Sequence, residues 1–170
     1  MGIGVKEGEM GREIRKVPRG WSHPRKEHRP EQYQPLYDKD FETAATEWKR
    51  GFYEWESGAH EDLQEHPERR TEMEFWEWDG GPPDREYHRP KWAEEPTCFQ
   101  VYETVSEGTP VSPVFETEDA LLAWLIKQGH SEHAARKFIE YGSAPSFIVM
   151  PRADGLPRIE SGIDALGLGE

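Results

Sequence analysis

Histidines are the first residues of this sequence whose type and spacing suggest chemistry, because six of the seven come in pairs. The pairs are His23 with His28, His60 with His66, and His130 with His133. Imidazole is a common zinc ligand, but a zinc site needs three or four converging ligands, and helical pairs work best four residues apart. None of the three pairs fits that pattern. We therefore predict no metal site and interpret the histidines as surface residues.

A search for nucleophiles and phosphate-binding loops identifies no catalytic residue. Cys98 is the only cysteine and falls in a predicted strand, so we interpret it as a small core residue rather than a reactive thiol. It can form no internal disulfide, which favours a reducing compartment. The sequence has no G-x-S-x-G elbow, no P-loop and no G-x-G-x-x-G motif. We expect a non-catalytic protein without a cofactor, and keep a small enzyme with an unfamiliar site as a third alternative.

Two polar segments remain as candidates for binding. The loop SEGTPVSP places hydroxyl and carboxylate groups on a backbone restricted by two prolines, although it can also be a simple connection to the next helix. Residues 31–95 contain tryptophans and have a net charge of −11 from 19 acidic and 8 basic residues. The candidate interaction residues are Glu54, Glu56, Glu61, Asp62, Trp76, Trp78 and Asp79 in the acidic segment, and Ser106, Glu107, Thr109 and Ser112 in the loop.

The charge of the whole chain limits its partners. The net charge is −13, yet residues 1–30 carry eight Lys or Arg against four Glu, so the remaining residues sum to −17. A surface this negative repels nucleic-acid phosphates and favours basic proteins, including those that bind nucleic acid. We expect no direct nucleic-acid binding. The alternative is that the acidity serves solubility alone.

An aromatic stripe predicts one long helix in the first half of the chain. From residue 41 the apolar residues recur at spacings of four, three, four and three, as on one face of a helix. The stripe consists of Phe41, Ala45, Trp48, Phe52 and Trp55. Asp38 or Asp40 can cap its start, and Gly58 can end it. A short helix is predicted at residues 60–65, and residues 72–92 are interpreted as ordered loop.

The best-defined group of elements lies near the C-terminus. Residues 97–105 alternate as a strand, with Phe99 and Val101 on one face and Cys98, Gln100 and Tyr102 on the other. Two helices follow, one from a Thr117 cap to Gly129 and one from a Ser131 cap to Gly142, and SFIVM closes the group as a strand.

The helix pair has the spacing of a helix-turn-helix, which would make its second helix a DNA reader. That helix offers only Arg136 and Lys137 to phosphates, and Glu132 and Glu140 flank them. We therefore prefer a structural helical hairpin laid on a small sheet.

The predicted fold class is α+β: a small sheet with a helical hairpin (β-α-α-β) in the C-terminal half, preceded by an aromatic-rich helix and long irregular segments. The predicted regions are an extended basic arm (1–38), an acidic Trp-rich region (39–95), the β-α-α-β module (96–151) and a tail (152–170), together one compact domain. Trp21, between Pro18 and Pro24, is expected to attach the arm to the body. No apolar run approaches the length of a membrane helix, so we expect a cytoplasmic protein.

Several runs of the sequence resemble an uncharacterised family of tailed-bacteriophage and prophage proteins. The runs are VPRGWSHP, QPLYDKDF, WEWDGGPPD, YETVSEGTPVSPVF and GHSEHAARKFIEYGSAPS, of which YETVSEGTPVSPVF is the most specific. The resemblance implies a setting in the bacterial cytoplasm, or in the virion, and assigns no residue a role. The leading hypothesis is a phage accessory protein that binds a basic or nucleic-acid-binding host protein. The alternative is a virion or assembly component attached through its basic arm.

Overall fold

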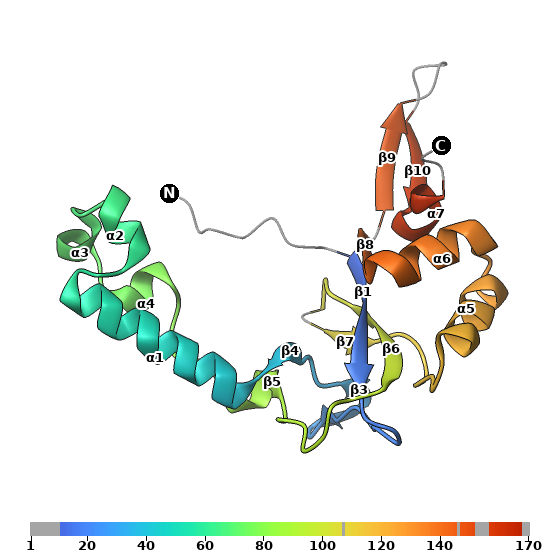
Figure 1. Cartoon of the computed structure of the whole chain (residues 1–170), viewed down its shortest axis with the longest axis horizontal. Coiled ribbons are helices and arrows are strands. Elements are labelled where there is room, and N and C mark those ends of the chain that lie inside the picture. Colours follow the sequence, from blue (N-terminus) through green and yellow to red (C-terminus); the bar gives the residue numbers. More distant parts are fainter. Residues whose placement is uncertain (1–10, 107, 146, 152–156, 168–170) are drawn as a thin grey trace. The chain divides into compact units, whose positions relative to one another are not determined.

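The structure is a computed structural model that describes residues 11–106, 108–145, 147–151 and 157–167. Its helices and small antiparallel sheets confirm the α+β class (Figure 1). The chain divides into two units. Residues 36–91 form the helical unit, and the described residues of 11–35 and 92–167 form the sheet unit. The segments before and after the helical unit therefore belong to one unit, whereas the sequence analysis assigned an arm (1–38) and a module (96–151) to separate regions of one compact domain.

The helical unit is built on one long helix. Its elements are β4 (Tyr37–Asp40), α1 (Phe41–Ser57), α2 (Glu61–Glu65), α3 (Arg69–Glu72), α4 (Phe75–Trp78), a 3-10 helix η1 (Arg85–Tyr87) and β5 (His88–Arg89), with β4 and β5 paired in parallel. The Asp40 side chain caps α1 by accepting the Thr43 N–H at 3.0 Å, and Gly58 ends it with φ +79°. The long helix and the short helix α2 are confirmed. The predicted loop at 72–92 is wrong in part, since it contains α4 and η1.

Aromatic rings form the core of the helical unit. Trp55, Leu63 and Phe75 are buried, and Trp48 and Phe52 pack against them. A Cβ atom on Gly51 would lie 2.7 Å from Cζ of Phe75, so the absence of a side chain lets α1 and α4 approach closely. The aromatic stripe of α1 therefore faces inward at its C-terminal half.

The sheet unit contains a four-stranded antiparallel sheet in the order β7-β6-β1-β8. Its elements are β1 (Gly11–Val17), β2 (Arg25–Lys26), β3 (Arg29–Tyr33), β6 (Cys98–Glu103), β7 (Thr109–Pro110), α5 (Glu118–Lys127), α6 (Glu132–Tyr141), β8 (Ser143–Pro145), β9 (Phe147–Pro151), β10 (Pro157–Ser161) and α7 (Gly162–Leu166). The caps predicted for the two helices are present, because Thr117 and Ser131 accept from the backbone of Ala120 and Ala134.

Strand β1 corrects the prediction of an extended arm. Residues 11–17 lie between β6 and β8 in the sheet, with Val17 opposite Cys98 and Gly11 opposite Pro145. Four of its seven residues are charged, so the segment lacks the apolar alternation of an ordinary strand. Arg15 is nevertheless buried, with its guanidinium over the Tyr102 ring at 4.4 Å from the centroid.

The predicted order of strand, two helices and strand is not reproduced as such. The short strand β7 lies between β6 and α5, and β8 supplies the fourth strand of the sheet. The predicted closing strand SFIVM corresponds to β9, which pairs with β10 as a separate antiparallel hairpin.

An aliphatic core lies between the sheet and the helices. Val101 of β6 packs with leucines of α5, with Phe138 of α6 and with Ile163 of α7. Residues 161–167, which belong to the predicted tail, therefore pack on the sheet unit through the buried Ile163. Cys98 is buried on the opposite face with Val17 and Tyr102, as expected of a core residue.

Candidate functional site

The helical unit contains an open groove of about 930 Å³. Four candidate residues from the sequence line it: Glu54 of α1, Glu61 of α2, Trp78 of α4, and Asp79 directly after α4. These positions lie up to 25 residues apart in the sequence, and the turns between the short helices bring them to one surface.

Aromatic rings make up the floor of this groove. Trp48, His60, Phe75 and Trp78 line it, with ring centroids 4.9 Å apart for His60 and Trp78 and 5.4 Å apart for Trp48 and Phe75. The ring of His60 is fixed because its Nδ1 accepts the N–H of Asp62 at the start of α2. The Trp48 indole donates to the carbonyl of Gly80 at 3.0 Å, which holds the segment after α4 against α1.

Carboxylates surround the rings, and they differ in their partners. Glu47 pairs with Lys39, and Glu54 lies 3.9 Å from Arg50. Within the described chain, Glu61 and Asp79 form no ion pair, and both are exposed. The helical unit as a whole contains sixteen acidic and eight basic residues, so its field attracts cations to the groove.

The remaining candidates of the acidic segment lie outside the groove lining. Asp62 is held by a bidentate contact with Arg69, whose Nη1 lies 2.6 Å and 2.7 Å from the two carboxylate oxygens. Trp76 is exposed on α4, and Glu56 is exposed near the end of α1. Asp62 therefore has a structural role.

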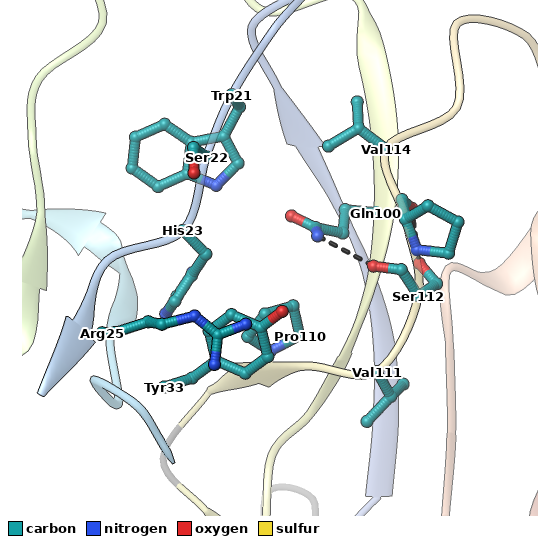
Figure 2. Close-up of a pocket in the computed structure, with 11 residues that line it drawn as sticks. Trp21, Ser22, His23, Arg25, Tyr33, Gln100, Pro110, Val111, Ser112 and Val114 are labelled. Atoms are coloured by element: carbon teal, nitrogen blue, oxygen red, sulfur yellow. Dashed lines mark hydrogen bonds between the residues drawn. The ribbon is translucent and has the colours of Figure 1, made fainter. Parts of the chain in front are cut away.

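The sheet unit contains a second, smaller pocket of about 510 Å³ (Figure 2). One side comes from residues 21–33, the other from residues 110–114, and Gln100 of β6 lies between them. Trp21 attaches its segment to the sheet, as predicted, because its indole Nε1 donates to the Tyr102 hydroxyl at 3.1 Å. It also packs edge-on against Trp92.

A chain of hydrogen bonds runs behind this pocket. The Tyr102 oxygen lies 3.1 Å from Nδ1 of His23 and 2.9 Å from Oε1 of Gln100. The Gln100 amide nitrogen donates to the carbonyl of Ser112 at 2.9 Å, and His23 Nε2 lies 2.6 Å from the carbonyl of Gln34. Burial lowers the pKa of His23; the Gln34 carbonyl opposes this effect, and the Arg15 charge adds to it. His23 is therefore neutral near pH 7.

The loop candidates have unequal roles. The Ser106 hydroxyl donates to the carbonyl of Glu103 and bonds the Thr109 hydroxyl, so these two groups stabilise the turn itself. Ser112 lines the pocket, and its hydroxyl oxygen accepts the Val101 N–H at 2.8 Å. Glu107 lies outside the described residues.

Sequence reasoning missed His23, Gln100 and Tyr102 as a group. A signal was present, because Gln100 and Tyr102 share a strand face with Cys98 and two polar side chains on a buried face need partners. His23 was grouped with His28 only because they are close in sequence. The expectation of a solvent-facing His130 is also wrong, since its Nδ1 lies 2.8 Å from the Asp164 carboxylate of α7.

No three His, Cys, Asp or Glu side chains converge as metal ligands within the part of the chain that the structure describes. Among the same residues, no helix has the length and apolar character needed to cross a bilayer. A search of family models, of curated proteins and of solved structures finds no match to this chain.

Proposed function

We propose that this chain is a non-catalytic, phage-encoded accessory protein that binds a basic segment of a host protein in the groove of the helical unit. The observation that carries the proposal is the combination of an aromatic floor with the carboxylates of Glu61 and Asp79, which have no ion-pair partner among the described residues. The phage setting depends on the sequence resemblance alone.

The groove offers complementary contacts to lysine and arginine side chains. Their aliphatic stems can pack on the Trp48 and Trp78 rings, while their charged ends reach the carboxylates. Buried aromatic anchors contribute most of the energy in many interfaces, and charge complementarity raises the association rate.

The helical unit also exposes aromatic side chains outside the groove. Tyr37 and Trp78 are exposed in the groove lining, and Tyr53, Trp76 and Tyr87 are exposed elsewhere on this unit. Tyrosine and tryptophan are enriched at protein interfaces, because each combines a large apolar area with a polar atom. A protein that binds nucleic acid carries the basic surface that this unit would engage, and occupancy by the acidic unit would compete with phosphates.

The proposal is tested with a fluorescent synthetic peptide of alternating arginine and leucine, titrated with the full chain and read by anisotropy. We expect saturable binding that weakens at least about tenfold when salt rises from about 50 mM to about 300 mM, because screening reduces charge attraction. A glutamate-leucine peptide should not bind.

The variant Glu54→Gln, Glu61→Gln, Asp79→Asn removes three groove charges. Its matched control, Glu94→Gln, Glu95→Gln, Glu118→Gln, removes the same charge from exposed positions of the sheet unit. We expect the groove variant to lose at least about tenfold in peptide affinity and the control to lose less than about threefold. Equal losses would show that net charge, rather than the groove, governs binding.

A second assay addresses the host partner. Immobilised wild-type protein and the Trp78→Ala variant are incubated with bacterial lysate at low and high salt. The proposal requires a nucleic-acid-binding protein that the wild type retains at low salt and that the variant releases. Retention of the same proteins by both would contradict the role of the groove.

A further inference from the structure

The pocket of the sheet unit contains a buried acceptor that its own hydrogen-bond chain does not fully satisfy. Three polar groups converge on the Tyr102 hydroxyl: the Trp21 indole N–H, Nδ1 of His23 and Oε1 of Gln100. A tyrosine hydroxyl has one hydrogen to donate. The remaining contacts show which of the three groups need that hydrogen.

The histidine tautomer is determined by its other nitrogen. Nε2 of His23 faces the Gln34 carbonyl at 2.6 Å, and a carbonyl can only accept, so Nε2 carries the hydrogen. In the neutral ring Nδ1 is then an acceptor, so the Tyr102 hydroxyl faces two acceptors, Nδ1 of His23 and Oε1 of Gln100, with one hydrogen to donate. The indole N–H of Trp21 donates to the same oxygen and supplies no hydrogen to the others.

Rotating the Gln100 amide by about 180° would not remove this competition for the Tyr102 hydrogen. Its Nε2 donates to the Ser112 carbonyl at 2.9 Å, and a flipped amide would place two acceptors against each other there. Its Oε1 therefore accepts from the Tyr102 hydroxyl at 2.9 Å and competes with Nδ1 of His23 for that single hydrogen. Gln100 is only 6% exposed and lies between the two sides of the pocket (Figure 2). A donor from a pocket occupant would satisfy it.

The charge around this pocket is opposite to that of the chain as a whole. Residues 11–35 contain seven Lys or Arg and three Glu. Arg25 lines the pocket with its guanidinium 4.3 Å from the Tyr33 ring centroid. Among the described residues, its hydrogen bonds go to the carbonyls of Pro30 and Glu31 and both use Nη1, so Nε and Nη2 can donate to an anion.

We propose that this pocket binds a nucleoside monophosphate, which joins a planar base to an anionic phosphate. A base N–H would donate to Gln100 Oε1, the base would lie among the Trp21 and Tyr33 rings, and the phosphate would bind Arg25. The volume of about 510 Å³ is in the range of small-molecule sites. This site is separate from the groove of the helical unit, and neither depends on the other.

The test uses NMR titration of the full chain with UMP, followed at the Trp21 indole and Gln100 amide signals. UMP is chosen because its base has one ring N–H and no amino group, so N3-methyl-UMP lacks the base donor. We expect UMP to bind with a Kd below about 1 mM, and N3-methyl-UMP, uridine and inorganic phosphate each to bind at least about tenfold more weakly. AMP with N6,N6-dimethyl-AMP repeats the comparison for a base that donates from an amino group.

Two variants in the β2–β3 hairpin distinguish a direct contact in the pocket from a general effect of positive charge. Arg25→Gln should weaken UMP binding at least about tenfold. Lys26→Gln, its neighbour outside the pocket lining, should change it less than about threefold. The proposal fails if neither nucleotide binds better than phosphate, if the methylated bases bind as well as their parents, or if the two variants have equal effects.

Discussion

The two units of this chain use aromatic residues for different purposes. In the helical unit Trp55 and Phe75 form the core, and neighbouring rings such as Trp78 continue from it to the groove surface. In the sheet unit the core is mainly aliphatic, and Tyr102 and Trp21 lie on the other face of the sheet in a hydrogen-bonded chain.

This difference separates two ways of building a binding surface. Where core rings extend to the surface, a flat or open groove results, and charges at its edge select the partner. Where rings are held by polar bonds, positions are more closely defined, and a pocket can present a single acceptor. The contrast predicts that the helical unit recognises a class of basic partners and that the sheet unit discriminates small ligands.

The largest effect is expected from the aliphatic core. Phe138→Ala in α6 removes a fully buried ring and should lower the free energy of unfolding by about 3–5 kcal/mol. Tyr141→Ala, an exposed position of the same helix, should change it by less than about 0.5 kcal/mol. Urea denaturation followed by circular dichroism measures both. Similar losses would mean that burial in this core does not set stability.

The polar face of the sheet should be the next most sensitive region. Tyr102→Phe keeps the ring but removes the hydroxyl that Trp21, His23 and Gln100 contact, so we expect a loss of about 1–3 kcal/mol. Tyr53→Phe, on an exposed side chain of α1, is the matched control and should be neutral. If Tyr102→Phe left the free energy of unfolding unchanged, the hydrogen bonds of Tyr102 would not distinguish the aromatic rings of the sheet unit from those of the helical unit.

The helical unit offers a test in which two effects have opposite signs. Replacing a helical glycine by alanine usually stabilises by about 0.5–1 kcal/mol. At Gly51 the new Cβ would meet the Phe75 ring, and overpacking costs about 1–3 kcal/mol, so Gly51→Ala should destabilise by about 1 kcal/mol. A Cβ atom on Gly81 would have no atom of the described neighbours within 4 Å, so Gly81→Ala should be close to neutral. Thermal unfolding compares the two, and a stabilised Gly51→Ala variant would show that α4 can move away.

The smallest effect concerns pH. Because burial lowers the pKa of His23 in the folded state, the unfolded chain binds this proton more readily. The contribution to stability is complete above the unfolded value near 6.5 and is lost as pH falls through it toward the lower folded pKa. The difference in unfolding free energy between wild type and His23→Asn should therefore shrink from about pH 7.5 to about pH 5.5. A constant difference would exclude a buried neutral His23.

Local signals explain which elements were predictable. Helices α5 and α6 carry their own caps at Thr117 and Ser131, and α1 carries an aromatic stripe, so each can be recognised from consecutive residues. Strand β1 is specified by its neighbours, β6 and β8, which lie more than eighty residues away. Charged side chains such as Lys16, which lies over the Phe99 ring, remove the apolar alternation from which a strand is predicted.

The candidate sites also differ in whether consecutive residues or distant parts of the chain define them. Glu61, Trp78 and Asp79 were identified because tryptophans and carboxylates are dense in the helical segment, but density alone could not separate them from Asp62, which pairs with Arg69. The pocket of the sheet unit joins residues from both sides of the helical segment, so its members become visible only when β1 and β6 are paired.

The central position of β1 has a consequence for synthesis of the chain. This strand is synthesised before its partner β6, which follows only after the whole helical unit has been translated. During that interval its backbone N–H and C=O groups lack their native partners, which is the condition under which strands associate wrongly. The charges of Arg12, Glu13, Arg15 and Lys16 would oppose such association. The charged residues that make β1 difficult to predict as a strand would thus also protect the nascent chain until β6 is available.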